Sequence, residues 1–104
     1  MDENKQKRLK AAGWKVGSAS EFLGLTPEEA EYVELKLALG SYLRDVRLNR
    51  RWTQAQLAER LGSSQSRVAK MESADSSVSL DLLVKALLAA GASTKDVGRV
   101  IGAV

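Results

Sequence analysis

Two helix-start signals separated by a single glycine constrain the fold of this chain more than any other feature. Thr53 and Gln56 have the spacing of a capping box, in which each side chain bonds the backbone amide of the other residue. Gly62 suits the left-handed end of the first helix, and Ser64 can cap the second. The sequence therefore predicts two short helices joined by a tight turn.

Residue sizes in this unit fit a steep crossing of the two helices. Ala58 is small enough for the crossing point, and Trp52 and Leu57 occupy the positions of a hydrophobic staple around the first cap. Val68 and Met71 share one face of the second helix, so both are expected to point into the core.

A longer helix is expected before this unit. Thr26 can cap it, Pro27 suits its first position, and Glu29 completes another capping box. From residue 28 to about residue 50, apolar residues recur at spacings of three and four, which predicts a buried stripe. Its members are Tyr32, Leu35, Leu39, Tyr42, Leu43 and Val46. A second face, formed by Val33 and Leu37, is expected to meet the amino-terminal segment or a partner chain. Gly40 is expected to allow a bend.

Two further helices are expected after the unit. Ser79 can cap a helix that ends at Gly91, and Ser93 or Thr94 can cap a last helix over residues 95 to about 101. The last helix is too short to bury its apolar side chains unaided. The side chains expected to be exposed there are Val97, Val100 and Ile101.

The first 25 residues differ from the rest. Residues 1–10 are almost wholly polar and are expected to form a solvated arm. Residues 14–16 alternate in polarity between two glycines and can form an edge strand. We therefore expect an arm with a short helical turn over residues 1–25 and an all-α domain of five helices over residues 26–104.

Composition excludes several classes of protein. The chain has no Cys and no His, which removes disulfides, thiolate or imidazole metal sites and imidazole catalysis. Ser66 and Lys70 have the spacing of a catalytic pair, but nothing buries the lysine to lower its pKa. We expect no enzyme activity, no metal and no cofactor. No stretch resembles a signal peptide or a membrane span, which favours a soluble cytoplasmic protein.

Charge is unevenly distributed along the chain. Lys and Arg total 16 against 13 Asp and Glu, a net charge of +3 that favours anionic partners only weakly. Residues 28–42 hold four Glu and one Lys, whereas residues 43–72 hold seven basic and three acidic residues. On a helical wheel, Ser66 and Lys70 lie nearly opposite Val68. The free face of that helix is therefore polar and basic.

The segment from Trp52 to Glu72 resembles the helix-turn-helix of the Xre family, which includes the lambdoid phage repressors. The resemblance covers roughly residues 13–92. The runs Gly13-Trp14-Lys15-Val16 and Glu21-Phe22-Leu23-Gly24-Leu25 are similar to a subgroup related to the antitoxins of host-inhibition-of-growth toxin-antitoxin modules. Ser63 departs from the family, which more often has an apolar residue there. The resemblance implies a repressor-like domain whose third helix enters the major groove of duplex DNA.

This resemblance places the base-reading residues at Gln65, Ser66 and Lys70, the same face that the helical wheel leaves free. Gln65 can pair with adenine and Lys70 with guanine. The resemblance also assigns Gln54 to a DNA phosphate, at a helix start where free amides favour an anion.

Basic residues near the two helices are expected to contact phosphates and to contribute little sequence information. They are Arg67, Arg50 and Arg51. By resemblance, Arg47 and Glu72 instead form a buried structural ion pair between the first and third helices. The loop over residues 73–77 has no basic residue, so phosphate contacts there must come from hydroxyls or backbone amides.

A homodimer on a near-palindromic site is expected, because one such module covers only a few base pairs. Candidate dimer surfaces are the Val97/Val100/Ile101 segment, the Val33/Leu37 face and the strand at Trp14.

The predicted function is a transcriptional regulator, most simply a repressor, associated with the nucleoid. The alternative is an antitoxin that neutralises a basic toxin directly, through an acidic surface that solubility and the helix dipole also explain. That surface comprises Glu21, Glu28, Glu29, Glu31 and Glu34.

Overall fold

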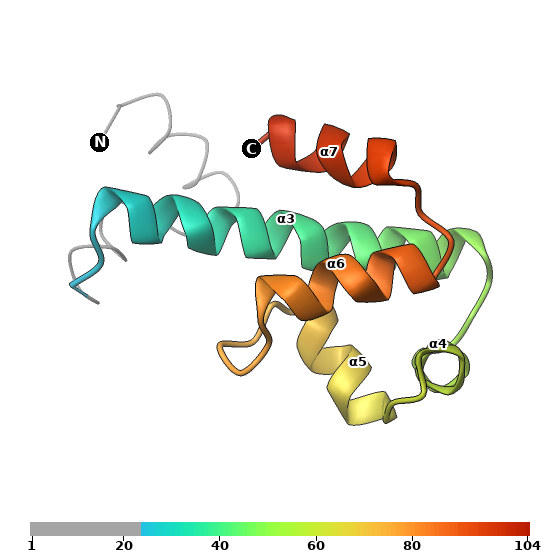
Figure 1. Cartoon of the computed structure of the whole chain (residues 1–104). Coiled ribbons are helices and arrows are strands. Elements are labelled where there is room, and N and C mark those ends of the chain that lie inside the picture. Colours follow the sequence, from blue (N-terminus) through green and yellow to red (C-terminus); the bar gives the residue numbers. More distant parts are fainter. Residues whose placement is uncertain (1–23) are drawn as a thin grey trace. The chain divides into compact units, whose positions relative to one another are not determined.

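A computed structural model of the protein describes residues 24–104, whose helices are labelled in Figure 1. This range contains five helices and no strand, so the all-α prediction is confirmed for it. The helices are α3 (Pro27–Asn49), α4 (Gln54–Leu61), α5 (Gln65–Glu72), α6 (Leu80–Ala89) and α7 (Thr94–Gly102). The strand predicted at residues 14–16, and nearly all of the arm predicted for residues 1–25, lie outside the described range.

The predicted start of α3 is confirmed. The Glu29 amide donates to the Thr26 hydroxyl at 3.1 Å, and the Thr26 amide donates to the Glu29 carboxylate at 3.2 Å. The first turns of α3 belong to a unit that ends at Val33, and residues 34–104 form a second compact unit.

The two helices at the centre of this unit begin and end where the sequence predicts. The Gln56 amide donates to the Thr53 hydroxyl at 3.1 Å, and the Thr53 amide donates to the Gln56 side chain at 2.8 Å. Gly62 ends α4 with a φ of 64°, in the left-handed region that favours glycine. The Ser64 hydroxyl caps α5 by accepting from the Arg67 amide at 3.2 Å.

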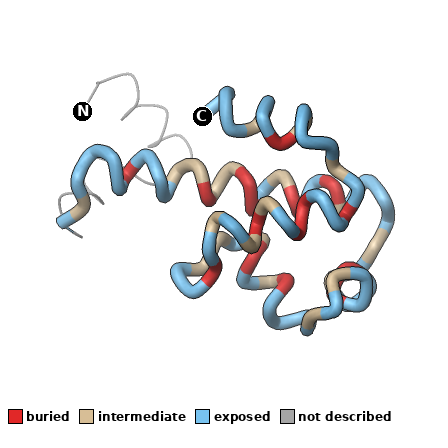
Figure 2. Tube along the Cα trace, viewed as in Figure 1, coloured by how far each residue is buried: buried red, intermediate tan, exposed pale blue. Residues whose placement is uncertain are grey.

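Buried residues gather where the second half of α3 meets α4, α5 and α6 (Figure 2). The largest fully buried side chains are Leu39, Leu43, Leu57, Val68, Met71, Leu83 and Leu87. The hydroxyl oxygen of Ser63, in the turn between α4 and α5, is buried without a hydrogen-bond partner. An apolar residue at this position, as in most of the family that the sequence resembles, would avoid that cost.

The last two helices also follow the predicted caps. The Ser79 hydroxyl accepts from the Leu82 amide at 3.1 Å, and Gly91 has a φ of 101°. Of the two candidate caps for α7, the structure uses Ser93, whose hydroxyl accepts from the Asp96 amide at 3.0 Å. None of the helices between residues 24 and 104 is both long enough and apolar enough to cross a bilayer.

The structure corrects the expectations for Tyr32 and Val97 and adds a finding at Gly40. Tyr32 is 44% exposed rather than buried, because periodicity identifies a helix face but not how far along it the core extends. Gly40 lies within α3, which continues to Asn49, and the glycine is a point of close helix packing. Val97 is only 6% exposed, because α7 folds back and adds this side chain to the core.

Candidate nucleic-acid interface

Helix α5 divides into a buried face and an exposed face. Val68 and Met71 are almost fully buried and hold α5 against the core. The other side of the helix carries an amide, a hydroxyl and two cations, all exposed to solvent. These side chains belong to Gln65, Ser66, Arg67 and Lys70. The three residues expected to read bases thus lie on an accessible surface.

Ser66 has one neighbour that orients it. Its hydroxyl oxygen lies 3.3 Å from the hydroxyl oxygen of Ser64, the cap of the same helix. Because either hydroxyl can donate, the pair can present one donor and retain acceptor sites toward solvent.

A hollow of about 340 Å³ lies between α5 and the start of α6. Its lining combines hydroxyls, two cations and two apolar side chains: Ser64, Ser66, Arg67, Lys70, Ser77, Val78 and Leu82. Hydroxyls and cations side by side form a suitable environment for a phosphate group.

Asp75 is the one carboxylate in the loop before α6. It accepts from the Ser77 hydroxyl at 2.5 Å and from the Ser77 amide at 2.9 Å. These two bonds, the hydroxyl first, hold the pKa of the Asp75 carboxyl below its usual value. The two bonds favour the charged form of Asp75 and hold Ser77 in place beside the hollow.

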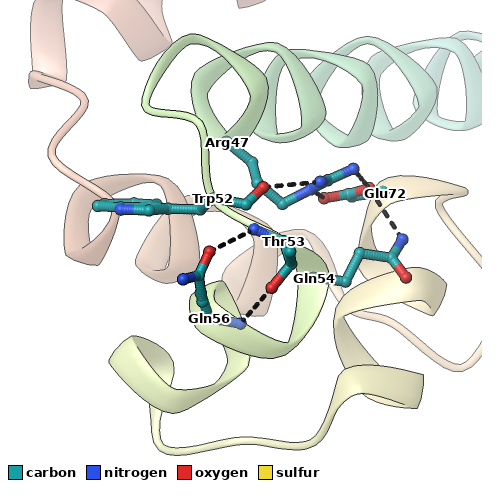
Figure 3. Close-up of polar contacts among 6 residues, drawn as sticks. All are labelled: Arg47, Trp52, Thr53, Gln54, Gln56 and Glu72. Carbon is teal, nitrogen blue, oxygen red and sulfur yellow. Dashed lines mark hydrogen bonds and ion pairs between the residues drawn. The ribbon is translucent and has the colours of Figure 1, made fainter.

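Arg47 of α3 and Glu72 of α5 form an ion pair, shown in Figure 3. Arg47 Nε donates to Glu72 Oε2 at 2.6 Å, and Arg47 Nη2 donates to Glu72 Oε1 at 3.1 Å. Their side chains are 11% and 6% exposed. Arg47 Nη1 also donates to the carbonyl oxygen of Trp52 at 3.0 Å. The pair therefore joins α3, the turn before α4, and the end of α5.

Gln54 lies in the first turn of α4, where the resemblance places a phosphate contact. Its side-chain amide nitrogen donates to Glu72 Oε1 at 3.2 Å. Thr53 satisfies one amide of this helix start, because its side chain caps the amide of Gln56. Gln54 is thus linked to the Arg47–Glu72 pair, a connection that no spacing in the sequence indicates.

Arg50 and Arg51 occupy different surroundings. The Arg50 guanidinium lies 5.4 Å from the centre of the Trp52 ring, and that ring points away from Gln54 and Glu72 (Figure 3). Arg50 also reaches Gly91, where a Cβ atom would lie 2.5 Å from Arg50 Nη2. Arg51 is exposed and has a φ of 59°, a left-handed backbone conformation that residues other than glycine rarely adopt.

Arg60 is a residue that sequence analysis missed. Its guanidinium lies 4.2 Å from the centre of the Trp52 ring, closer than that of Arg50. Trp52 itself is partly buried and packs against the core, as expected for a member of the hydrophobic staple. A cation eight residues after a tryptophan gives no recognised pattern, so only the fold shows this contact.

Two capped helices joined by a glycine turn, with the second helix exposing a polar and basic face, define a helix-turn-helix DNA-binding domain. A family model described as helix-turn-helix matches residues 43–96, and the chain belongs to this family. The protein is therefore a DNA-binding regulator of the Xre type, a family defined by DNA binding and not by enzyme activity. Comparisons with curated proteins and with solved structures gave no match.

Proposed function

We propose that this protein is a transcriptional repressor that binds a specific duplex sequence with α5 in the major groove. The observation that carries the proposal is the exposed face of α5, which lies opposite the buried Val68 and Met71. A helix anchored on one side and polar on the other is suited to insertion into the groove.

Three side chains on this face are proposed to read bases. Gln65, at the start of α5, can bond adenine N6 and N7, and Lys70 can donate to guanine N7 and O6. Ser66, between them, can bond either kind of base edge. Each well-formed pair would contribute about 1 to 3 kcal/mol of discrimination against a wrong base.

Phosphates are proposed to bind on both sides of α5. Arg67 lines the hollow between α5 and α6, where Ser64 and Ser77 add hydroxyls. Gln54 and the free amides at the start of α4 supply the second site. Arg51 is exposed and can add a cation, whereas Arg50 would first have to leave the Trp52 ring. These contacts would set affinity more than sequence preference.

The protein is proposed to act as a homodimer on a near-palindromic site, with its two α5 helices about 34 Å apart in successive major grooves. Among the surfaces of residues 34–104, the end of α7 favours this role. Ile101 is 40% exposed although it shares a helix face with the buried Val97, and Val104, which follows the end of α7, is 50% exposed. Replacing Ile101 with Glu is expected to convert the dimer to a monomer in sedimentation analysis, whereas an unchanged dimer would exclude this surface.

Selection from random duplexes tests the proposed function. The purified protein is expected to enrich a near-palindromic sequence whose half-sites are one helical turn apart. Failure to enrich any sequence, at a salt concentration where non-specific binding is weak, would contradict sequence-specific binding.

An antitoxin role is the second candidate, with autoregulation as its secondary activity. Glu28, Glu29 and Glu31 are exposed on α3 and can face a basic toxin, although Glu29 also serves the capping box. Glu34 lies on the same helix, and Glu21 lies outside the described residues. Co-purification of a second small polypeptide that is encoded beside this chain would support the antitoxin role. The absence of such a reading frame from the operon would contradict the antitoxin role.

A further inference from the structure

We propose that Glu72 positions Gln54 for its contact with a DNA phosphate, so that the buried ion pair acts on DNA binding as well as on the fold. The inference rests on the proposed function, because it assumes that Gln54 meets a phosphate. It assigns Glu72 a positioning role that it exerts through Gln54.

The bond to Glu72 fixes the orientation of the Gln54 amide. A carboxylate can only accept hydrogen bonds, so the atom of Gln54 that faces Glu72 Oε1 at 3.2 Å must be the amide nitrogen. Figure 3 shows the Gln54 side chain reaching toward Glu72 from the first turn of α4. The nitrogen uses one of its two hydrogens for this bond, and the second hydrogen remains for another acceptor.

Glu72 is itself held firmly by Arg47. Its carboxylate accepts two bonds from Arg47, at 2.6 and 3.1 Å, and its side chain is only 6% exposed. Arg47 is held in turn by the carbonyl oxygen of Trp52 at 3.0 Å. Gln54 is therefore bonded to a fixed group, and it loses less side-chain freedom when it binds than an unanchored glutamine would lose.

The negative charge of Glu72 is compensated by Arg47. A lone carboxylate beside a phosphate would repel it, but Arg47 compensates the charge of Glu72 through two charge-assisted bonds. The group behind Gln54 is thus a neutral pair. A phosphate can approach the amide without meeting an uncompensated negative charge.

The obvious substitution, Glu72→Gln, leaves the Arg47 charge buried without a partner and can unfold the chain. The double substitution Arg47→Met/Glu72→Met removes the anchor of Gln54 but fills the site with apolar side chains, a replacement that cores often tolerate. The matched control is Asp81→Asn/Lys85→Gln, which removes an exposed ion pair of α6 with the same zero change in net charge and is expected to leave affinity unchanged.

Affinity is measured by fluorescence anisotropy on the selected site and on a scrambled duplex. Gln54→Ala and the Arg47/Glu72 double variant are each expected to weaken binding about tenfold on both duplexes, because a phosphate contact carries no sequence information. The triple variant, which combines Gln54→Ala with Arg47→Met/Glu72→Met, is expected to bind no more weakly than Gln54→Ala or the double variant alone. The slope of log affinity against log salt is expected to stay constant, since Gln54 is uncharged.

Additive losses in the triple variant would overturn the positioning role and leave the proposed function standing. A loss confined to the selected site would also overturn it, because it would show displacement of α5 instead of a lost phosphate contact. An unchanged affinity for Gln54→Ala would overturn the phosphate assignment itself.

A second measurement needs no variant. In the wild-type chain without DNA, the side-chain NH₂ group of Gln54 is expected to exchange with solvent more slowly than that of the exposed Gln65, because its nitrogen is held by Glu72. Equal exchange at the two side chains would contradict the anchoring of Gln54.

Discussion

Gly40 of α3 lies so close to Met71 of α5 that a Cβ atom on the glycine would fall 2.6 Å from the Met71 carbonyl oxygen. The Glu72 carbonyl oxygen would lie 3.0 Å from the same atom. Because both neighbours are backbone atoms, they cannot turn aside as the end of a flexible side chain can. Glycine at this position therefore sets how closely α3 approaches the helix proposed to enter DNA.

Gly40→Ala is expected to push α3 and α5 apart and to lower the free energy of unfolding by about 1 to 3 kcal/mol, as overpacked sites do. Urea denaturation measures this change. Gly98→Ala is the matched control, because a Cβ at this α7 position would meet nothing within 4 Å. The control is expected to raise stability by about 0.5 to 1 kcal/mol. Equal effects at the two glycines would contradict close packing at Gly40.

The Arg47–Glu72 pair predicts a strong asymmetry between single and double substitutions. Glu72→Met alone leaves the Arg47 guanidinium buried and unpaired, which is expected to cost about 3 to 5 kcal/mol of stability. Arg47→Met/Glu72→Met removes both charges and is expected to recover most of that loss. Denaturation midpoints test this, and a double variant less stable than the single variant would show that the pair is worth more than apolar packing.

Arg67 is predicted to contact a phosphate without reading sequence. Arg67→Ala is expected to weaken binding equally on the selected and scrambled duplexes. It is also expected to reduce the salt slope of log affinity by about 1.8, because each protomer of the proposed dimer loses one phosphate contact worth about 0.9. Lys95→Ala removes the same charge from exposed α7 and serves as the control. If both variants lower the slope alike, Arg67 acts only through the net charge of the protein.

Asp96 predicts a pH dependence of stability. The Ser93 amide, the Ser93 hydroxyl and the Arg99 guanidinium bond this carboxylate and lower its pKa below the usual value. A lowered folded-state pKa contributes stability above the unfolded-state pKa, and that stability is lost as pH falls through the folded-state pKa. Asp96→Asn is therefore expected to lower the thermal midpoint at pH 7 and to have little effect at pH 2. A difference that is constant with pH would contradict a role for the charge.

Much of the fold could be predicted from signals between neighbouring residues. Capping chemistry is contained in a few neighbouring residues, so the starts of α3, α4, α5 and α6 and the turn at Gly62 could be predicted from spacing alone. The exposed face of α5 could also be predicted from local sequence. Once the helix and its apolar residues are known, a helical wheel shows which side chains point away from the core.

Contacts between distant segments could not be predicted in this way. The burial of Val97 depends on how α7 folds back, and the need for Gly40 depends on where α5 crosses α3. The bond from Gln54 to Glu72 joins residues 18 positions apart, and neither residue type is unusual for its helix. Each of these features depends on tertiary packing that periodicity does not encode.

The most direct measurement of the central claim compares binding of wild type and Gln65→Ala/Lys70→Ala to the selected and scrambled duplexes. The double variant is expected to lose most of the preference for the selected site and to keep most of its affinity for the scrambled duplex. It is also expected to unfold at the same temperature as wild type, because both side chains are exposed. A double variant that still prefers the selected site as strongly as wild type would contradict base reading by α5.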